Sequence, residues 1–187
     1  KPGTVGLPLP GGSFRIVDPA TLETLQVGED GLILFGGTQV MLGYLNDPEK
    51  TAAAIIELDG RRWYKTGDKG HLDEDGFLTI VDRYSRFAKV GGEMISLGAI
   101  ETVIGKLLPE DAEILATAVP DGRKGEMVVL LFAGGIERDE LKALIDQSAL
   151  NPLMRPSRLI PVEAIPKLGS GKNDFNRAKR IALEAAA

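Results

Sequence analysis

The chain has 187 residues, of which 43% are hydrophobic and 26% charged, with a formal net charge of −5. This composition predicts a folded protein of one domain or two small ones, and the acidic balance argues against a nucleic-acid-binding surface. Cysteine is absent and His71 is the single histidine, which excludes disulfides and a catalytic thiol and leads us to expect no metal site. No apolar run is long enough to span a bilayer and no signal-peptide pattern opens the chain, so we expect a cytoplasmic protein.

Residues 1–83 predict a first domain made mostly of β-structure. Runs rich in β-branched and aromatic residues, bounded by Gly, Pro and Asp, predict strands at Ser13–Asp18, Gly31–Phe35 and Phe77–Val81. Asp47 can cap a helix that starts at Pro48 and that places Ala52, Ile55 and Ile56 on one face. The segment Asp73–Gly76 predicts a hairpin turn. Together these elements predict a small antiparallel β-barrel or sandwich.

From residue 84 onward the pattern predicts a second domain with mixed helices and strands. Arg86–Ser96 predicts a hairpin that turns at glycines, and Ser96 can cap a helix whose apolar residues recur at helical spacing as far as Leu107. The remaining predictions are strands at Ile114–Val119, Met127–Phe132 and Leu159–Ile165, and helices at Glu137–Ser148 and Asp174–Ala186. We therefore predict an α+β protein, with a β-barrel subdomain at residues 1–83 and a compact α+β domain at residues 84–187.

A glycine-rich segment, Gly169-Ser170-Gly171-Lys172, lies between a predicted strand and a predicted helix, a context that is typical of phosphate-binding P-loops. The P-loop also needs a glycine five positions before Gly171 and a hydroxyl residue after the lysine, but Pro166 and Asn173 occupy those positions. The P-loop interpretation therefore fails. Two interpretations of Lys172 remain. It is either a point charge that a mobile loop carries into a site, or a solvated lysine of a surface loop.

Three further positions each allow a functional and a structural interpretation. Asp68 follows a Thr-Gly turn at the end of an aromatic strand, where a carboxylate can accept hydrogen bonds from both ribose hydroxyls or can bond its own backbone. Arg83 lies between the two halves, where it fits contact with a sugar or phosphate, or an ion pair between domains. Gly91-Gly92 lets a thin ligand pass close to the backbone, or simply makes a tight turn.

The order and spacing of these clusters resemble the acyl-adenylate-forming superfamily, which includes acyl-CoA synthetases, peptide-synthetase adenylation domains and luciferases. The matching segments are Gly43-Tyr44 with Asn46–Thr51, Tyr64–Asp68, Asp82-Arg83 with Lys89, Gly91-Gly92 and Ile100-Glu101, and Pro166–Lys172. Within the superfamily, Arg86–Leu97 and Leu168–Phe175 resemble the bacterial acyl-[acyl-carrier-protein] synthetase / 2-acylglycerophosphoethanolamine acyltransferase branch. The superfamily motifs for the ATP phosphates and adenine are absent, so we expect an excised C-terminal fragment that is inactive by itself.

The resemblance implies a role in adenylate formation for three residues. Asp68 and Arg83 would hold the ribose hydroxyls of ATP and of the acyl-adenylate. Lys172 would be catalytic, because its charge would stabilise the transition state as the substrate carboxylate attacks the α-phosphate.

The resemblance also implies that residues 84–187 form a mobile lid that serves two half-reactions. Ser85 would be the hinge, although the superfamily commonly has Asp or Lys at this position. Lys89, Gly91 and Gly92 would line the tunnel for the phosphopantetheine thiol after the lid has turned.

The implied function is that of an ATP-dependent ligase that activates fatty acids, transfers them to acyl carrier protein and so supports reacylation of 2-acylglycerophosphoethanolamine. The implied cofactors are ATP, with Mg²⁺ in the full-length enzyme, and the phosphopantetheine of the acceptor. The implied partners are a fatty acid and acyl carrier protein or CoA, with no nucleic acid and no membrane span. The full-length protein would be cytoplasmic, or located at the cytosolic face of the inner membrane. The alternatives are an acyl-CoA synthetase fragment and a non-enzymatic module that docks a carrier protein.

Overall fold

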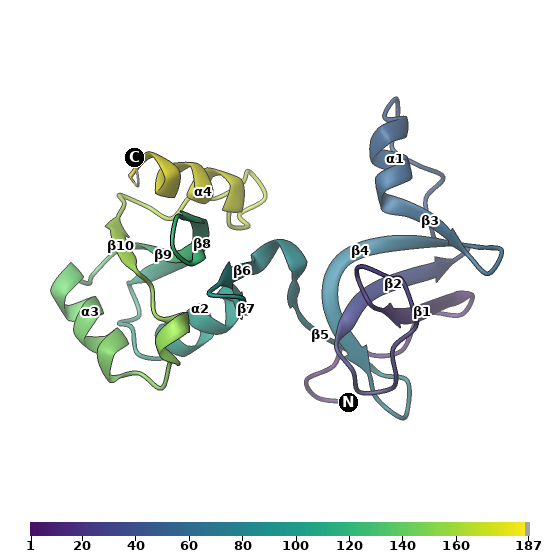
Figure 1. Ribbon diagram of the computed structural model, residues 1–187, viewed down its shortest axis with the longest axis horizontal. Helices are drawn as coiled ribbons and strands as arrows, with labels where there is room; N and C mark the ends of the chain where they lie inside the picture. The colour runs from purple at the N-terminus through teal and green to yellow at the C-terminus, as the bar shows by residue number, and fades with distance from the viewer. Residues whose placement is uncertain (186–187) are drawn as a thin grey trace. The chain divides into compact units, whose positions relative to one another are not determined.

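The computed structural model describes residues 1–185 and divides the chain into two compact units, Lys1–Ser85 and Arg86–Ala187 (Figure 1). Each unit has its own sheet and its own buried apolar clusters. The predicted α+β fold class is confirmed. That the second unit acts as a mobile lid stays a prediction.

The first unit is built on one antiparallel sheet that curls into a half-barrel (Figure 1). Its strands are β1 (Gly12–Val17), β2 (Gly31–Gly37), β3 (Ile55–Leu58), β4 (Arg61–Leu72) and β5 (Leu78–Arg83). They lie in the order β1-β2-β4-β3, and β5 pairs with β4. Neighbouring residues of a strand point to opposite faces, and Ile16 and Val17 are nevertheless both buried. Each face of the sheet therefore holds a small apolar cluster, one around Ile33 and Leu78 and the other around Trp63.

The helix predicted at Pro48 forms, but it is shorter than expected. Helix α1 (Pro48–Ala54) begins where Asp47 accepts a hydrogen bond from the Lys50 amide at 2.9 Å. Placing Ile55 and Ile56 on this helix was wrong, because they begin β3 and pair with residues of β4. These β-branched side chains lie opposite aromatic neighbours in the sheet, an arrangement that favours strand over helix.

The second unit contains a five-stranded sheet covered by helices (Figure 1). Its elements are η1 (Tyr84–Arg86, a 3₁₀ turn that begins in the first unit), β6 (Phe87–Val90), β7 (Glu93–Ser96), α2 (Leu97–Gly105), β8 (Glu113–Asp121), β9 (Gly125–Ala133), α3 (Arg138–Gln147), η2 (Pro152–Met154, also 3₁₀), β10 (Arg158–Pro161) and α4 (Phe175–Glu184). The strands lie in the order β10-β9-β6-β7, with β8 paired to β9. Only β10 and β9 run parallel among the pairs of this sheet in the described residues.

Alternation along the two central strands gives the second unit a buried cluster on each face of its sheet. Ala116 and Leu130 pack with apolar residues of α2 and α3, whereas Leu115 and Leu131 pack with Ala178 of α4. The predicted pairing of Ile114–Val119 with Met127–Phe132 and the predicted Ser96 cap are both confirmed. Because α2 and α3 cover one face and α4 the other, the sheet is buried on both sides.

Two predicted element ends in this unit were wrong, and a third lies outside the described residues. Strand β10 ends at Pro161, because the chain turns away after the Val162 amide has bonded the Phe132 carbonyl at 2.9 Å. Leu107 lies beyond the end of α2 and is 42% exposed. The predicted end of the last helix at Ala186 falls outside the residues that the structure describes, in which α4 ends at Glu184.

Candidate functional site

Strands β4 and β5 bring together the two residues that were expected to hold a ribose. Asp68 and Arg83 are opposite each other in the strand register, and Arg83 Nε lies 2.9 Å from Asp68 Oδ1. The Asp68 side chain is 19% exposed, whereas that of Arg83 is 65% exposed. Because both residues belong to the first unit, an ion pair between domains is the wrong explanation for Arg83. The pair presents a carboxylate and a guanidinium side by side at the surface of this unit.

A bulge in β4 places the Asp68 carboxylate. The strand does not end at the Thr-Gly step, as expected, but continues to Leu72. Leu34 pairs with Lys65 and Leu32 with Lys69, so the three residues 66–68 lie opposite a single residue of β2. Thr66 Oγ1 donates to the Ile33 carbonyl at 2.8 Å and accepts from the Asp68 amide at 3.0 Å. These bonds hold the bulge, and a bulge redirects the side chain that follows it.

Tyr64, which sequence reasoning used only as part of a motif, adds a phenol near this pair. The pKa of Tyr64 is raised, mainly by a hydrogen bond with the Tyr44 side chain and also by burial, while the charge of Arg83 opposes this shift. The Lys50 ammonium lies 4.2 Å from the Tyr44 ring centroid, a cation–π contact. The raised pKa keeps the Tyr64 phenol neutral, and its hydrogen bond with Tyr44 joins β4 to the segment around Tyr44.

The hairpin between β6 and β7 carries the residues expected to line a thiol tunnel. Gly91 and Gly92 have φ values of 61° and 92°, the left-handed conformation that a two-residue hairpin turn requires. The tight-turn interpretation is therefore sufficient for these glycines, and a role in a tunnel stays a prediction. The hairpin is anchored, because the Gly91 amide donates to the Lys124 carbonyl at 2.8 Å and the Lys89 amide to Glu126 Oε2 at 2.6 Å.

The segment that carries Lys172 forms a small closed hairpin before α4. The Leu168 amide donates to the Lys172 carbonyl at 2.7 Å, and the Gly171 amide donates to the Leu168 carbonyl at 2.8 Å. The Lys172 side chain itself is exposed. The lysine is therefore displayed at the surface of the second unit by a backbone that hydrogen bonds hold in shape.

The predicted residues are divided between the two units. Asp68 and Arg83 belong to the first unit, and Ser85 is its last residue and lies in η1. Lys172 and the hairpin of Gly91 and Gly92 belong to the second unit. The catalytic, hinge and tunnel roles of these residues stay predictions.

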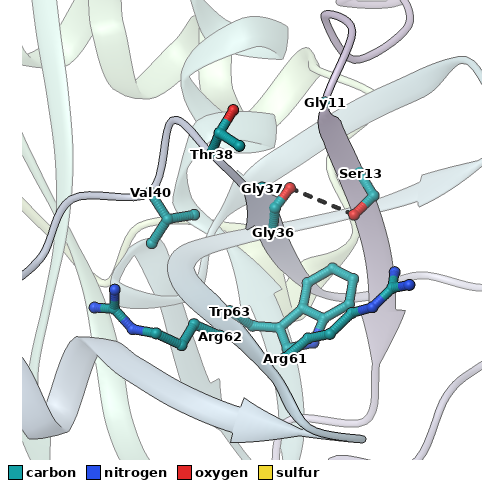
Figure 2. Close-up of a pocket in the computed structure, with 9 residues that line it drawn as sticks. All are labelled: Gly11, Ser13, Gly36, Gly37, Thr38, Val40, Arg61, Arg62 and Trp63. Carbon is teal, nitrogen blue, oxygen red and sulfur yellow. Dashed lines mark hydrogen bonds between the residues drawn. The ribbon is translucent and has the colours of Figure 1, made fainter.

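A cavity of about 420 Å³ lies elsewhere in the first unit, and sequence reasoning did not anticipate it. Figure 2 shows its lining residues, which are Gly11, Ser13, Gly36, Gly37, Thr38, Val40, Arg61, Arg62 and Trp63. One side of it is fixed by Arg62, whose Nη2 donates to the carbonyls of Met41 and Leu42 at 3.1 and 2.9 Å. None of the residues expected to act in catalysis or binding lines this cavity.

Residues 1–185 contain neither a candidate metal site nor a candidate membrane-spanning helix. Within that range, the side chains of His, Asp and Glu form no group of three that could hold a metal ion. The helices of the same range include none that is long and apolar enough to cross a membrane.

Comparison with known proteins matches this chain to two family descriptions. Residues 1–45 match the AMP-binding enzyme family, and residues 99–172 match the AMP-binding enzyme C-terminal domain. The 2-succinylbenzoate–CoA ligase of Listeria monocytogenes is 37% identical over 90% of this chain and 35% of its own length. The 4-coumarate–CoA ligase of Vanilla planifolia is 37% identical over 100% of this chain and 34% of its own length.

A solved structure supports the same relationship. The ATP-bound structure of MatB from Rhodopseudomonas palustris superposes with a TM-score of 0.85 and 29% identity, over 100% of this chain and 37% of that chain. The chain therefore belongs to the AMP-binding superfamily of adenylate-forming enzymes and corresponds to their C-terminal part. It spans about a third of the length of the relatives that it matches.

Proposed function

We propose that this chain is the C-terminal part of an ATP-dependent acid–thiol ligase, which converts a carboxylic acid to an acyl-adenylate and passes the acyl group to a thiol. The observation that carries the proposal is the distribution of the motif residues. Asp68 and Arg83 are paired at 2.9 Å on the first unit, while Lys172 is displayed on the second. The 3₁₀ turn Tyr84–Arg86 joins the two units and contains Ser85. This is the arrangement that a two-step enzyme with a rotating lid would need.

In the first step, Asp68 and Arg83 would hold the ribose hydroxyls of ATP, with the Asp68 carboxylate accepting hydrogen bonds from them. Lys172 would stabilise negative charge as the substrate carboxylate attacks the α-phosphate and pyrophosphate leaves. Mg²⁺ would accompany the ATP phosphates in the full-length enzyme.

In the second step, the acceptor thiol would attack the acyl carbonyl, and AMP would leave. Rotation near Ser85 would withdraw Lys172 and bring the hairpin of Lys89, Gly91 and Gly92 to the site. Within residues 1–185, an added Cβ at Gly91 or Gly92 would meet no atom within 4 Å apart from its chain neighbours, so the tip of the hairpin is open. An open tip is compatible with the passage of a thin phosphopantetheine arm.

The proposal also covers the class of acid that is activated and the thiol that accepts the acyl group. The resemblance of Arg86–Leu97 to the acyl-[acyl-carrier-protein] synthetase branch favours fatty acids as substrates and acyl carrier protein as acceptor. The product would then be used in the reacylation of 2-acylglycerophosphoethanolamine. The two curated relatives described above are CoA ligases, and they favour the alternative of CoA as acceptor. We place the full-length enzyme in the cytoplasm or at the cytosolic face of the inner membrane.

The experiment is a two-stage assay of the full-length protein. The first stage measures ATP–pyrophosphate exchange with a panel of fatty and aromatic acids, and exchange that depends on one class of acid is the expected result. The second stage offers the acyl-adenylate to CoA, to acyl carrier protein with phosphopantetheine, and to the same carrier without it as the matched control. No exchange with any acid would refute the ligase and leave the non-enzymatic docking module. Transfer to CoA alone would refute the carrier-protein assignment.

A further inference from the structure

Arg86, the first residue of the second unit, follows the proposed hinge directly and points into the unit. Its side chain is only 12% exposed. An arginine is seldom buried unless its charge is paired. Its surroundings therefore indicate what the residue does.

The Arg86 guanidinium makes two different contacts at once. Nη2 lies 2.7 Å from Glu101 Oε2 on α2, and the flat guanidinium lies 4.3 Å from the ring centroid of Phe175. The second carboxylate oxygen of Glu101 accepts a hydrogen bond from the Ala116 amide on β8 at 2.7 Å. A planar guanidinium can form an ion pair at its edge and stack on a ring with its face, which lysine cannot do.

Phe175 connects this cluster to the loop that carries Lys172. It is the first residue of α4 and lies three positions after that lysine. Between them, the Asp174 side chain caps α4 by accepting from the Arg177 amide at 3.0 Å, while the Asp174 amide donates to the Pro166 carbonyl at 2.8 Å. The base of the Lys172 hairpin is therefore attached to the residue on which Arg86 stacks.

We propose that Arg86 is a positioning residue, which holds the Lys172 loop in place through its contact with Phe175. The expected effect on catalysis rests on the proposed function. The coupling of Arg86 to the Lys172 loop does not, because all of these residues belong to the second unit. The rigid part of the unit would then begin at Arg86, immediately after Ser85. When the chain turned at Ser85, the second unit and its Lys172 loop would therefore move together as one rigid body.

Amide hydrogen exchange of the 187-residue chain, measured by NMR, tests the coupling without any need for activity. The amides of Leu168 and Gly171 report on the Lys172 loop, and the amide of Ala116 reports on the Glu101 contact. Arg86→Lys keeps the charge for Glu101 but loses the planar stack. We expect exchange at Leu168 and Gly171 to accelerate about three- to tenfold, with Ala116 unchanged.

Two substitutions of Phe175 test the ring itself, and one substitution at the other end of α4 serves as the control. Phe175→Leu should accelerate the loop amides in the same way, whereas Phe175→Tyr, which keeps the ring, should leave them at the wild-type rate. The control is Arg158→Met, because Arg158 Nη1 donates to the Ala185 carbonyl at 2.8 Å, at the far end of the same helix. It should not change the loop amides.

Three results of the exchange measurement would overturn the proposal. The first is unchanged exchange of the loop amides in Arg86→Lys. The second is equal exchange of these amides in Phe175→Leu and Phe175→Tyr. The third is uniform acceleration of exchange throughout the second unit. In the full-length enzyme, Phe175→Leu should slow adenylate formation but not transfer from preformed acyl-adenylate, and an unchanged adenylation rate would also count against the proposal. A wild-type enzyme that forms no adenylate would refute the proposed function, and the exchange data would still decide on the coupling.

Discussion

Asp68→Asn separates a structural role of this residue from a nucleotide-binding role, because the two predict effects on different quantities. In the structure Asp68 Oδ1 lies 2.9 Å from Arg83 Nε, and the Arg83 side chain is 65% exposed. An ion pair with one well-solvated member contributes at most about 1 kcal/mol to stability. The asparagine carbonyl can still accept from Arg83. We therefore expect the free energy of unfolding to fall by less than about 1 kcal/mol.

The expected effect on nucleotide affinity is larger. Hydrogen bonds to a charged group contribute about 1.5–3 kcal/mol, and an asparagine at position 68 would keep the shape of the side chain but lose the charge. A loss of that size corresponds to an affinity for ATP that is lower by about 10- to 150-fold. The chemistry of the ribose therefore predicts a binding defect in a protein that folds almost normally.

The assay combines two measurements and one control. Denaturant unfolding of the chain is followed by the fluorescence of Trp63, the single tryptophan, which is 3% exposed and so reports on the first unit. Binding is measured as the KM for ATP in adenylate formation by the full-length protein. The control is Asp59→Asn, which removes a carboxylate that pairs with Arg15 at 2.6 Å on the same unit. A stability loss above about 2 kcal/mol with an unchanged KM, or equal KM effects in both variants, would refute the assignment.

Two further predictions concern backbone contacts. Gly70→Ala should destabilise the first unit by more than about 2 kcal/mol, because its Cβ would overlap the Thr79 carbonyl oxygen. Gly105→Ala should be nearly neutral, because its Cβ would meet no atom of residues 1–185 within 4 Å outside its own helix backbone. Urea unfolding of both variants checks this, and equal midpoints would contradict it. Hydrogen bonds from the backbone amides of Arg123 and Lys124 lower the pKa of the Asp121 carboxyl in the folded chain below its ordinary value of 3.8. The stability that these bonds contribute is therefore present above pH 3.8, and it is lost as the pH falls through the lowered pKa of the folded chain. An NMR titration of the Asp121 carboxyl carbon should show this, and a midpoint at or above 3.8 would contradict it.

Local signals in the sequence predicted the parts of the fold that depend on neighbouring residues. The Asp47 and Ser96 caps and the turn at Gly91-Gly92 all formed as expected, because a cap or a two-residue turn is specified within a few positions. The bulge opposite Ile33 was not predictable in this way. It depends on how many residues of β4 pair with β2, and that number is set by strands far apart in the sequence.

The same distinction applies to the candidate site. Asp68 and Arg83 could each be selected from a motif, but their contact follows from the register of β4 against β5. Arg86 was part of a recognised segment without any assigned role, because its partners Glu101 and Phe175 come from two distant elements. Side-chain contacts between such elements become visible only in the folded unit.

We propose that Lys172 serves the first half-reaction and not the second. Lys172→Ala in the full-length enzyme should slow adenylate formation by about 10²–10³-fold, since offsetting the developing charge contributes about 3–4 kcal/mol. Transfer from preformed acyl-adenylate to the thiol should keep its rate, and Lys179→Ala, which removes an exposed lysine of α4, should affect neither step. The decisive measurement is therefore the pair of single-turnover rates for Lys172→Ala. A slow first step with a normal second step is the predicted result. Equal slowing of both steps, or normal rates for both, would contradict the role proposed for Lys172.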